Sequence, residues 1–400
     1  MIIRETYLNK LNKYRDKKLI KVITGIRRSG KSTLMSLYQQ QLMKSGVDAN
    51  QIISINFEDY DNYDLLESKT LYAYLKEKLI DSSKKFYVFL DEIQQVESFE
   101  RIMDSLYIRD NVDLYVTGSN AKLLSGELST LLSGRYVEIM VLPLSFKEYV
   151  SAFDQPINHK ALYNKYIQFG SLPYVLDLDD DEDVIKGYLR GVFSTVVLKD
   201  IVARKKIADV MMLESVIRFL FDAVGSIISI KKISDSLTSA GRKISSHTVE
   251  SYISGLVESY VLYPVKRYDV KGKQHLKTLE KYYIADLGLR YLQLGNRGVD
   301  LGHLLENVVY FELLRRGYDV YIGKVDAYEI DFIAVSQTET LYYQVALTVK
   351  DKETLERELR PLRAVSDHFP KCILTLDDEM EINYDGIRII NAIDFLLDIS

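Results

Sequence analysis

Residues 25–32 read Gly-Ile-Arg-Arg-Ser-Gly-Lys-Ser and fit the pattern G-x-x-x-x-G-K-[ST] at every fixed position. Gly25 and Gly30 permit backbone angles that other residues avoid, so successive N–H groups can point at phosphate oxygens. Lys31 can neutralise the β- and γ-phosphates, and the Ser32 hydroxyl can bind Mg²⁺. The spacing therefore predicts a loop that binds a nucleoside triphosphate together with Mg²⁺.

The segments on either side of this loop supply the context that the motif requires. An apolar, strand-like run at 19–24 precedes it, and apolar residues at helical spacing, among them Leu34 and Leu42, follow it. A chance match on a surface loop would lack both segments. The predicted nucleotide contacts are Gly25, Ile26, Arg27, Arg28, Ser29, Gly30, Lys31, Ser32 and Thr33.

A second candidate group is a pair of carboxylates, Asp91 and Glu92, directly after the apolar run 86–90. Beside a phosphate-binding loop, Asp91 would hold Mg²⁺, and Glu92 would orient or deprotonate an attacking water molecule. The alternative is an exposed acidic loop after a buried strand. The phosphate loop upstream favours the hydrolytic pair.

Small polar residues, Ser119 and Asn120, follow another apolar run at 112–117. At the carboxyl edge of a parallel sheet, either side chain could reach the γ-phosphate or its attacking water. Both are candidates, and Asn120 joins Glu92 in the predicted catalytic set. The alternative is a helix cap, because serine and asparagine are favoured at that position.

Arg135 follows a predicted helix at 122–132 and precedes the last strand-like run. An arginine at this place could enter the nucleotide site of a neighbouring subunit and stabilise charge in the transition state. The alternative is an ordinary surface arginine. The first interpretation requires a homo-oligomer.

Strand-like and helical patterns alternate between residues 19 and 142. The strand-like runs are 19–24, 51–57, 86–90, 112–117 and 136–142. Alternation of this kind predicts an α/β fold in which helices cover both faces of a parallel sheet. The chemistry-bearing residues would then gather at one edge of that sheet.

Composition sets wider bounds. A chain of 400 residues suggests several domains, and 47% hydrophobic content favours a folded protein. The net charge of −5 argues against a uniformly basic surface that coats nucleic acid. The single cysteine, Cys372, excludes a disulfide within the chain. The N-terminal stretch does not resemble a secretory signal, and no apolar run reaches the roughly 18 residues of a membrane span. We therefore expect a cytoplasmic protein without membrane contact.

These motifs together resemble the AAA+ ATPases, and in particular bacterial and archaeal AAA-type ATPases with a C-terminal domain of unknown function. The segments that carry the resemblance are 25–32, 90–94, 117–120, 132–136, 142–146 and 197–201. The resemblance implies ATP as the nucleotide, a P-loop core at 1–148, and a helical lid and connector at 149–212. It also implies that Gly170-Ser171-Leu172-Pro173 is a lid motif with Pro173 near the adenine.

Residues 213–292 follow the plan of a winged helix. A short helix at 230–237 precedes a helix with Ser246 as its N-cap, and two alternating runs at 261–268 and 277–284 would form a ribbon. The basic residues of this ribbon are Lys266, Arg267, Lys271, Lys273, Lys277 and Lys281. Such a wing could contact DNA phosphates, or the domain could dock a protein partner instead.

Residues 300–400 resemble the fold of restriction endonucleases and Holliday-junction resolvases. The resemblance makes Glu306, Asp331 and Gln344 the candidate metal ligands of a nuclease site. Position 346 is alanine, where these enzymes carry the lysine that assists the attacking water. We therefore expect a degenerate domain that binds DNA or a partner, although Glu306 and Asp331 could also be ordinary buried, hydrogen-bonded acids.

The sequence as a whole predicts an AAA+ ATPase that uses ATP and Mg²⁺ to switch or drive an attached module that binds DNA or protein. Two alternatives stay open. One is an ATP-dependent nuclease that acts through the C-terminal domain. The other is an ATP-gated DNA-binding regulator with little turnover.

Overall fold

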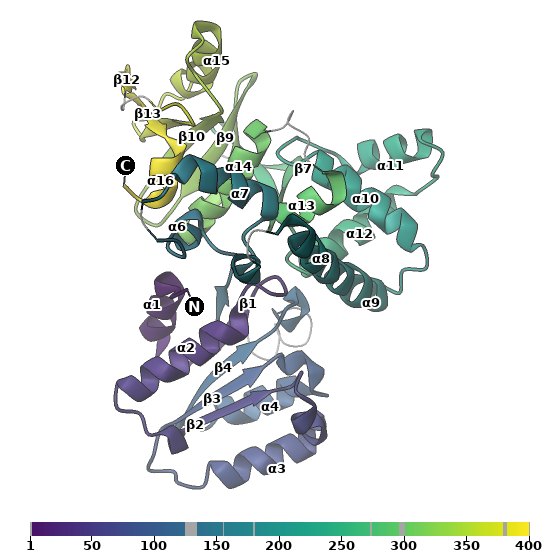
Figure 1. Cartoon of the computed structure of the whole chain (residues 1–400), viewed down its shortest axis with the longest axis vertical. Helices are drawn as coiled ribbons and strands as arrows, with labels where there is room; N and C mark the ends of the chain where they lie inside the picture. The colour runs from purple at the N-terminus through teal and green to yellow at the C-terminus, as the bar shows by residue number, and fades with distance from the viewer. Residues whose placement is uncertain are drawn as a thin grey trace. The chain divides into compact units, whose positions relative to one another are not determined.

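The computed structural model describes residues 2–124, 134–154, 156–178, 181–272, 274–295, 301–378 and 382–399. The chain forms two compact units. The first comprises Met1–Pro143 with Glu258–Tyr260, and the second comprises Leu144–Val257 with Val261–Ser400. Figure 1 shows the elements of both units. The finer division into four domains, with boundaries near residues 148, 212 and 300, stays a prediction.

The first unit contains a five-stranded parallel sheet in the order β2-β3-β4-β1-β5. Its strands are β1 (Ile20–Thr24), β2 (Ile52–Asn56), β3 (Phe86–Asp91), β4 (Val112–Thr117) and β5 (Tyr136–Met140). All five strands were expected from the sequence, and their ends differ from the expected ones by at most two residues. The order places β1 between β4 and β5, so the loop after β1 emerges where the strand order reverses.

Helices cover both faces of this sheet, because successive side chains of a strand point to opposite sides. Helices α1 (Glu5–Tyr14) and α2 (Lys31–Lys44) share one hydrophobic cluster with the β3 side chains Tyr87 and Phe89. Helices α3 (Ser68–Lys78) and α4 (Phe99–Tyr107) share the other cluster with Val88 and Leu90. Short 3₁₀ segments complete the unit: η1 (Ala49–Gln51), η2 (Tyr60–Leu66), η3 (Ile93–Gln95) and η4 (Ala121–Leu124).

Of the helix expected at 122–132, only the first residues are described, and they belong to η4. Residues 125–133 lie outside the described part of the chain. This part of the prediction is therefore not tested.

The second unit begins with helices. They are α6 (Phe146–Val150), α7 (His159–Phe169), α8 (Glu182–Phe193), α9 (Ala203–Lys205), α10 (Val210–Asp222), α11 (Ile230–Ser239), α12 (Ser246–Glu258) and α13 (Leu287–Leu294), with the 3₁₀ segment η5 (Pro173–Asp177) and the π-helical segment η6 (Ser194–Val202). The predicted N-cap of α12 was wrong by one residue. The hydroxyl of Ser245, not that of Ser246, accepts the hydrogen bond of the Thr248 N–H, at 3.0 Å.

An eight-stranded sheet follows, in the order β12-β13-β11-β10-β9-β8-β6-β7. Its strands are β6 (Leu262–Asp269), β7 (Gln274–Ile284), β8 (Asp319–Val325), β9 (Tyr328–Val335), β10 (Thr340–Ala346), β11 (Lys371–Thr375), β12 (Ile382–Tyr384) and β13 (Ile387–Asn391). The expected ribbon is present as the β6–β7 hairpin, but it is not a separate wing. Strand β6 pairs in parallel with β8, where Arg267 lies opposite Ile322, so hairpin and C-terminal strands share one sheet.

Three helices complete the second unit: α14 (Leu301–Arg315), α15 (Lys352–Arg363) and α16 (Ala392–Leu397). Strands β12 and β13 and helix α16 were not predicted. Gly317, two residues after the end of α14, has the left-handed φ of 89° that favours glycine. Within the ranges given above, no helix combines the length and the apolar character needed to cross a bilayer.

A buried ion pair ties β1 to β4 inside the first unit. Lys21 and Asp113 have side chains with no exposed surface, and their charged groups form an ion pair. The Tyr115 hydroxyl donates a second hydrogen bond to the Asp113 carboxylate, at 2.9 Å. Burial lowers the pKa of Lys21, and the charge of Asp113 opposes this shift.

We expect Lys21→Met to lower the free energy of unfolding by about 3–5 kcal/mol, because it leaves the Asp113 carboxylate buried without its cation. The matched control is Lys18→Met. Lys18 pairs with Asp110 at 2.8 Å, but that carboxylate is 99% exposed. Its loss should cost less than about 1 kcal/mol. Urea unfolding of the full chain measures both effects, and equal losses would contradict the assignment.

Candidate functional site

The loop between β1 and α2 adopts the backbone that the motif predicts. Gly25 has φ 138° and Gly30 has φ 91°, and both values lie in the region that side chains rarely allow. Gly25 also has no room for a side chain, because a Cβ atom there would lie 2.1 Å from the carbonyl oxygen of Val141. Arg28, at φ 69°, takes a left-handed conformation as well. The loop therefore turns tightly and presents its backbone.

An arginine from outside the motif supports this loop. The Arg4 guanidinium, which is buried, donates hydrogen bonds to the carbonyl oxygens of Ser29 at 3.0 Å, Leu142 at 2.9 Å and Pro143 at 3.3 Å. These contacts join the loop to the segment after β5. Sequence reasoning missed Arg4, since no local pattern links it to partners as many as 139 positions away.

The ammonium of Lys31 lies within the curve of the loop. Its Nζ donates to the carbonyl oxygens of Gly25 at 3.0 Å and Ile26 at 3.2 Å, and lies 3.9 Å from Glu92 Oε1. Burial lowers the pKa of Lys31, and the charges of Glu92 and Asp91 oppose that shift. Carbonyl dipoles hold this cation in place until an anion competes for it.

The Ser29 hydroxyl provides a test of whether the loop fits a phosphate. It is buried, and among the described residues it has no hydrogen-bond partner. An unsatisfied buried hydroxyl is costly, and an oxygen of a bound anion could accept its proton. Together with the tight backbone turn at Gly25, this orphaned group fits a phosphate-binding loop. Thr33, also predicted here, lies in the exposed first turn of α2.

Asp91 ends β3 beside two hydroxyl groups. The Thr117 hydroxyl at the end of β4 donates to Asp91 Oδ1 and accepts the Glu92 N–H at 2.8 Å. Burial raises the pKa of Asp91, and hydrogen bonds from Ser32 and Thr117 oppose that shift. The predicted metal residues, Ser32 and Asp91, are thus adjacent, and their oxygens suit Mg²⁺.

The Glu92 carboxylate is held by neighbouring polar groups. Its Oε2 accepts hydrogen bonds from the Ser119 hydroxyl, at 3.1 Å, and from the Gln94 amide. Of the two small polar residues after β4, Ser119 therefore contacts the candidate base, and the catalytic role of Asn120 stays a prediction. Sequence reasoning missed Gln94, although its position two residues after Glu92 could have drawn attention.

Arg135 lies just before β5, at the amino-terminal ends of the strands. The phosphate loop follows the opposite, carboxyl end of β1. The Arg135 carbonyl oxygen accepts the N–H of Ile20, the first residue of β1. The guanidinium pairs with Asp104 and lies 5.3 Å from the centre of the Tyr107 ring. At about 3.3 Å per residue, the length of β1 separates Arg135 from the loop of its own chain. A role in trans stays a prediction.

Pro173 begins η5 in the second unit, so its predicted place near the adenine stays a prediction. The turn before it is fixed by a buried carboxylate. Asp286 accepts the N–H groups of Ser171 at 2.6 Å and Leu172 at 3.1 Å. Burial raises the pKa of Asp286 to about 6, and these hydrogen bonds oppose the shift.

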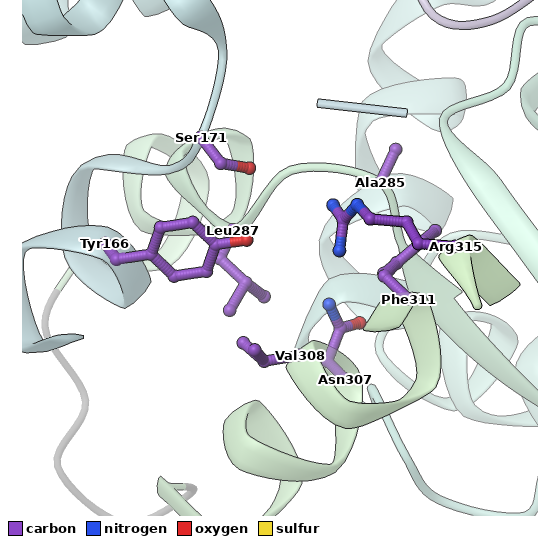
Figure 2. A pocket seen from close by; sticks show the side chains of 8 residues that line it. All are labelled: Tyr166, Ser171, Ala285, Leu287, Asn307, Val308, Phe311 and Arg315. Atoms are coloured by element: carbon purple, nitrogen blue, oxygen red, sulfur yellow. The ribbon is translucent and has the colours of Figure 1, made fainter. Parts of the chain in front are cut away.

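A small cavity in the second unit lies close to this turn, and Figure 2 shows the eight side chains that line it. Its polar groups are largely engaged by the backbone. The Tyr166 hydroxyl and the Arg315 guanidinium both donate to the Leu144 carbonyl, at 2.8 and 3.2 Å. Asn307 bonds both the N–H and the carbonyl of Ile284. The cavity therefore offers few polar groups to a ligand.

Of the three residues of the predicted nuclease site, Glu306 and Asp331 both face the Lys281 ammonium, at 2.8 and 3.8 Å, and Gln344 does not. The Gln344 amide oxygen accepts the Asp331 N–H at 2.8 Å, and its nitrogen donates to Glu358 of α15 at 2.8 Å. Glu306, on α14, bonds Lys281 and Tyr283 instead. Over the described ranges, no group of three His, Cys, Asp or Glu side chains is arranged to hold a metal ion.

The basic ribbon also differs from its prediction at one position. Lys281 was expected to contribute to a basic surface, but its side chain is only 4% exposed and is paired with carboxylates. Lys273 and the side chain of Lys277 lie outside the described part of the structure. Lys266 is exposed, and Lys271 pairs with Asp326 at 2.6 Å. Any phosphate-binding surface here would be smaller than the sequence suggests.

Comparisons with known proteins agree with the fold of the first unit. Residues 17–150 match the model of a family described as an AAA domain, and residues 160–300 match a domain of unknown function, DUF8612. An uncharacterized protein of Haemophilus influenzae is 41% identical over 400 residues, which cover 99% of each chain. An uncharacterized protein of Methanocaldococcus jannaschii is 29% identical over 384 residues, 90% of this chain and 82% of that protein.

Among solved structures, a Walker-type ATPase of Pyrococcus abyssi is similar, with a TM-score of 0.53 and 15% identity. The match covers 73% of this chain and 96% of that one. At this identity the likeness concerns the fold alone. The first unit is thus a P-loop domain of the AAA type, while the winged-helix and nuclease-like character of the second unit stays a prediction.

We expect Gly25→Ala to abolish nucleotide binding and to destabilise the chain, because the new methyl group collides with the Val141 carbonyl. The matched control is Gly46→Ala, since Gly46 has φ 96° but no atom within 4 Å of the added Cβ. Its strain alone should cost about 1–2 kcal/mol. Thermal unfolding and binding of a fluorescent nucleotide measure the two variants. Normal binding by Gly25→Ala would contradict the close approach.

Proposed function

The chain belongs to the same family as the Haemophilus influenzae relative, with an AAA domain at its N-terminus, and we propose that it hydrolyses ATP to switch or drive its second unit. The observation that carries this proposal is that three groups lie at the same end of the parallel strands. They are the loop at 25–32, the adjacent Ser32 and Asp91 side chains, and the Glu92 carboxylate with its hydrogen-bond donors. Three strands contribute: β1 leads into Lys31, β3 ends at Asp91, and β4 ends at Thr117.

Each residue has a role that follows from its position. Mg²⁺, when bound with ATP, would neutralise phosphate charge, and Ser32 and Asp91 would hold it. The N–H groups of the loop and the Lys31 ammonium would bind the phosphates. Glu92 would accept a proton from the attacking water. Thr117 would orient both carboxylates, since it bonds one side chain and the backbone of the other.

The contacts of Glu92 also suggest how turnover would be controlled. Its carboxylate is contacted by Ser119, Gln94 and Lys31. A base that donors already engage is a poorer proton acceptor, so basal hydrolysis should be slow. Binding of phosphate to Lys31 would remove one of these contacts. This favours an ATPase that works as a switch coupled to the second unit, which would bind DNA or a protein.

The test is steady-state ATP hydrolysis by two variants. We expect Lys31→Ala to weaken ATP binding about 10- to 100-fold, because a charge-assisted contact is lost. We expect Glu92→Gln to keep binding and to lower hydrolysis about 10²- to 10⁴-fold. Matched controls are Lys44→Ala, at the other end of α2, and Glu97→Gln, both at exposed positions.

Unchanged nucleotide binding by Lys31→Ala would overturn the assignment of the site. Duplex DNA, added to the wild-type chain, distinguishes the two kinds of second unit. Stimulation that Glu92→Gln abolishes would support a DNA-coupled ATPase. Indifference to DNA would move the second unit into the protein-docking class.

A finger role for Arg135 predicts complementation between two inactive variants. Arg135→Ala should lower turnover about 10³-fold, because a transition-state charge contact is lost. Its nucleotide loop is intact, whereas Lys31→Ala keeps Arg135 but lacks a working loop. Mixed oligomers should therefore regain a substantial part of the activity. Failure to regain activity, with mixed assembly verified by mass, would assign Arg135 to its own chain's ion pair with Asp104.

A further inference from the structure

A lysine lies at the centre of the acidic cluster in the second unit. Lys281 Nζ, from β7, lies 2.8 Å from Glu306 Oε1, 2.8 Å from Glu329 Oε1 and 3.8 Å from Asp331 Oδ1. The side chains of Lys281 and Glu306 are only 4% and 5% exposed. The carboxylates come from α14 and β9, so this one ammonium joins three elements.

A β-bulge directs Asp331 toward this cluster. Tyr321 of β8 pairs with Ile333, and Gly323 pairs with Ile330, so a step of two residues on β8 matches a step of three on β9. The extra residue lies between Ile330 and Ile333, and bulges of this kind re-aim side chains. Freed from the regular ladder, the Asp331 backbone N–H bonds the Gln344 side chain.

Further donors of the protein contact two of these carboxylates, those of Glu306 and Asp331. The Tyr283 hydroxyl donates to the same Glu306 oxygen that Lys281 contacts. Asp331 Oδ2 accepts the Val345 N–H at 2.9 Å. Burial and the Glu306 charge raise the pKa of Asp331 to about 8, while Lys281 opposes that shift. The carboxylates raise the pKa of Lys281 above its usual value, against the effect of burial.

We propose that Lys281 is a built-in cation, which occupies the place that a divalent metal would take between Glu306, Glu329 and Asp331. A compact ammonium with three donors can compensate clustered carboxylates as a metal ion does. This cluster then holds no divalent metal ion in its native state. Its cluster serves to fasten the β6–β7 hairpin to α14 and to the bulged strand. This inference does not depend on the ATPase proposal.

The same geometry contradicts a catalytic role for Lys281 in DNA cleavage. A lysine that assists an attacking water needs metal-bound phosphate beside it, and metal ligands need free lone pairs. Here the ammonium occupies the point between the carboxylates, and the Gln344 amide oxygen accepts the Asp331 backbone N–H. Removal of the lysine should therefore create a metal site rather than destroy one.

The experiment is Mn²⁺ binding to the full chain without nucleotide, followed by electron paramagnetic resonance of free Mn²⁺. Lys281→Met keeps the length of the side chain but removes its charge. We expect it to bind one additional Mn²⁺ per chain relative to wild type. The additional ion should be absent from the double variant Lys281→Met/Asp331→Asn, which shows where it binds.

Two outcomes would overturn the proposal. One is Mn²⁺ binding by the wild-type chain that Asp331→Asn abolishes, since the native cluster would then be a metal site. The other is a folded Lys281→Met chain that binds no additional ion. Should Lys281→Met fail to fold without metal, the milder variant Lys281→Met/Glu329→Gln leaves two carboxylates and the same comparison. Stabilisation of that variant by Mn²⁺, but not by NaCl of equal ionic strength, would support the proposal, and its absence would overturn it.

Discussion

The cost of burying charge governs this structure, because three lysines of the described part of the chain lie almost fully inside it. Lys21, Lys31 and Lys281 have side chains that are 0%, 4% and 4% exposed. An unpaired charge at such depth would cost several kcal/mol, so each ammonium must be compensated by its surroundings. The manner of compensation differs among the three. Lys21 belongs to a structural ion pair, Lys31 to a candidate ligand site, and Lys281 to a cluster that connects three elements of the second unit.

Lys31 is the least compensated of the three. Backbone carbonyls hold it, and its carboxylate contact is long, at 3.9 Å. Lys281, in contrast, has two carboxylates at 2.8 Å. The pKa of Lys31 is lowered by burial, whereas that of Lys281 is raised by its acids. An anion such as phosphate would therefore compensate the charge of Lys31. It would add little at Lys281, whose charge is already compensated by two carboxylates.

The features that could be predicted from the sequence are those that depend on residues close together in the chain. The phosphate loop, the Asp91–Glu92 pair and all five strands of the first sheet depend on local spacing and local apolar pattern, and the structure has them. Arg4 and Gln94 were missed for different reasons. Arg4 acts through partners that are distant in the chain, while Gln94 bonds Glu92 by a side-chain geometry that spacing does not encode.

The second unit shows a further limit. A count of charges cannot distinguish a lysine on a surface from one inside, so Lys281 was assigned to a basic wing. Its burial follows from the pairing of β6 with β8, and the position of Asp331 follows from a bulge. Neither feature has a local sequence signal. Gln344, predicted as a metal ligand together with Glu306, donates instead to Glu358 of α15.

The candidate sites of the two units differ in how fully their polar groups are compensated by the protein itself. In the first unit the Ser29 hydroxyl has no partner among the described residues, and the Lys31 ammonium relies on carbonyls. A ligand that completes such a site releases free energy that can change the conformation around it. In the second unit Lys281 already occupies the centre of the acidic cluster, so a ligand there would have to displace this lysine first. Of these two sites, the one that a ligand would complete therefore lies in the first unit.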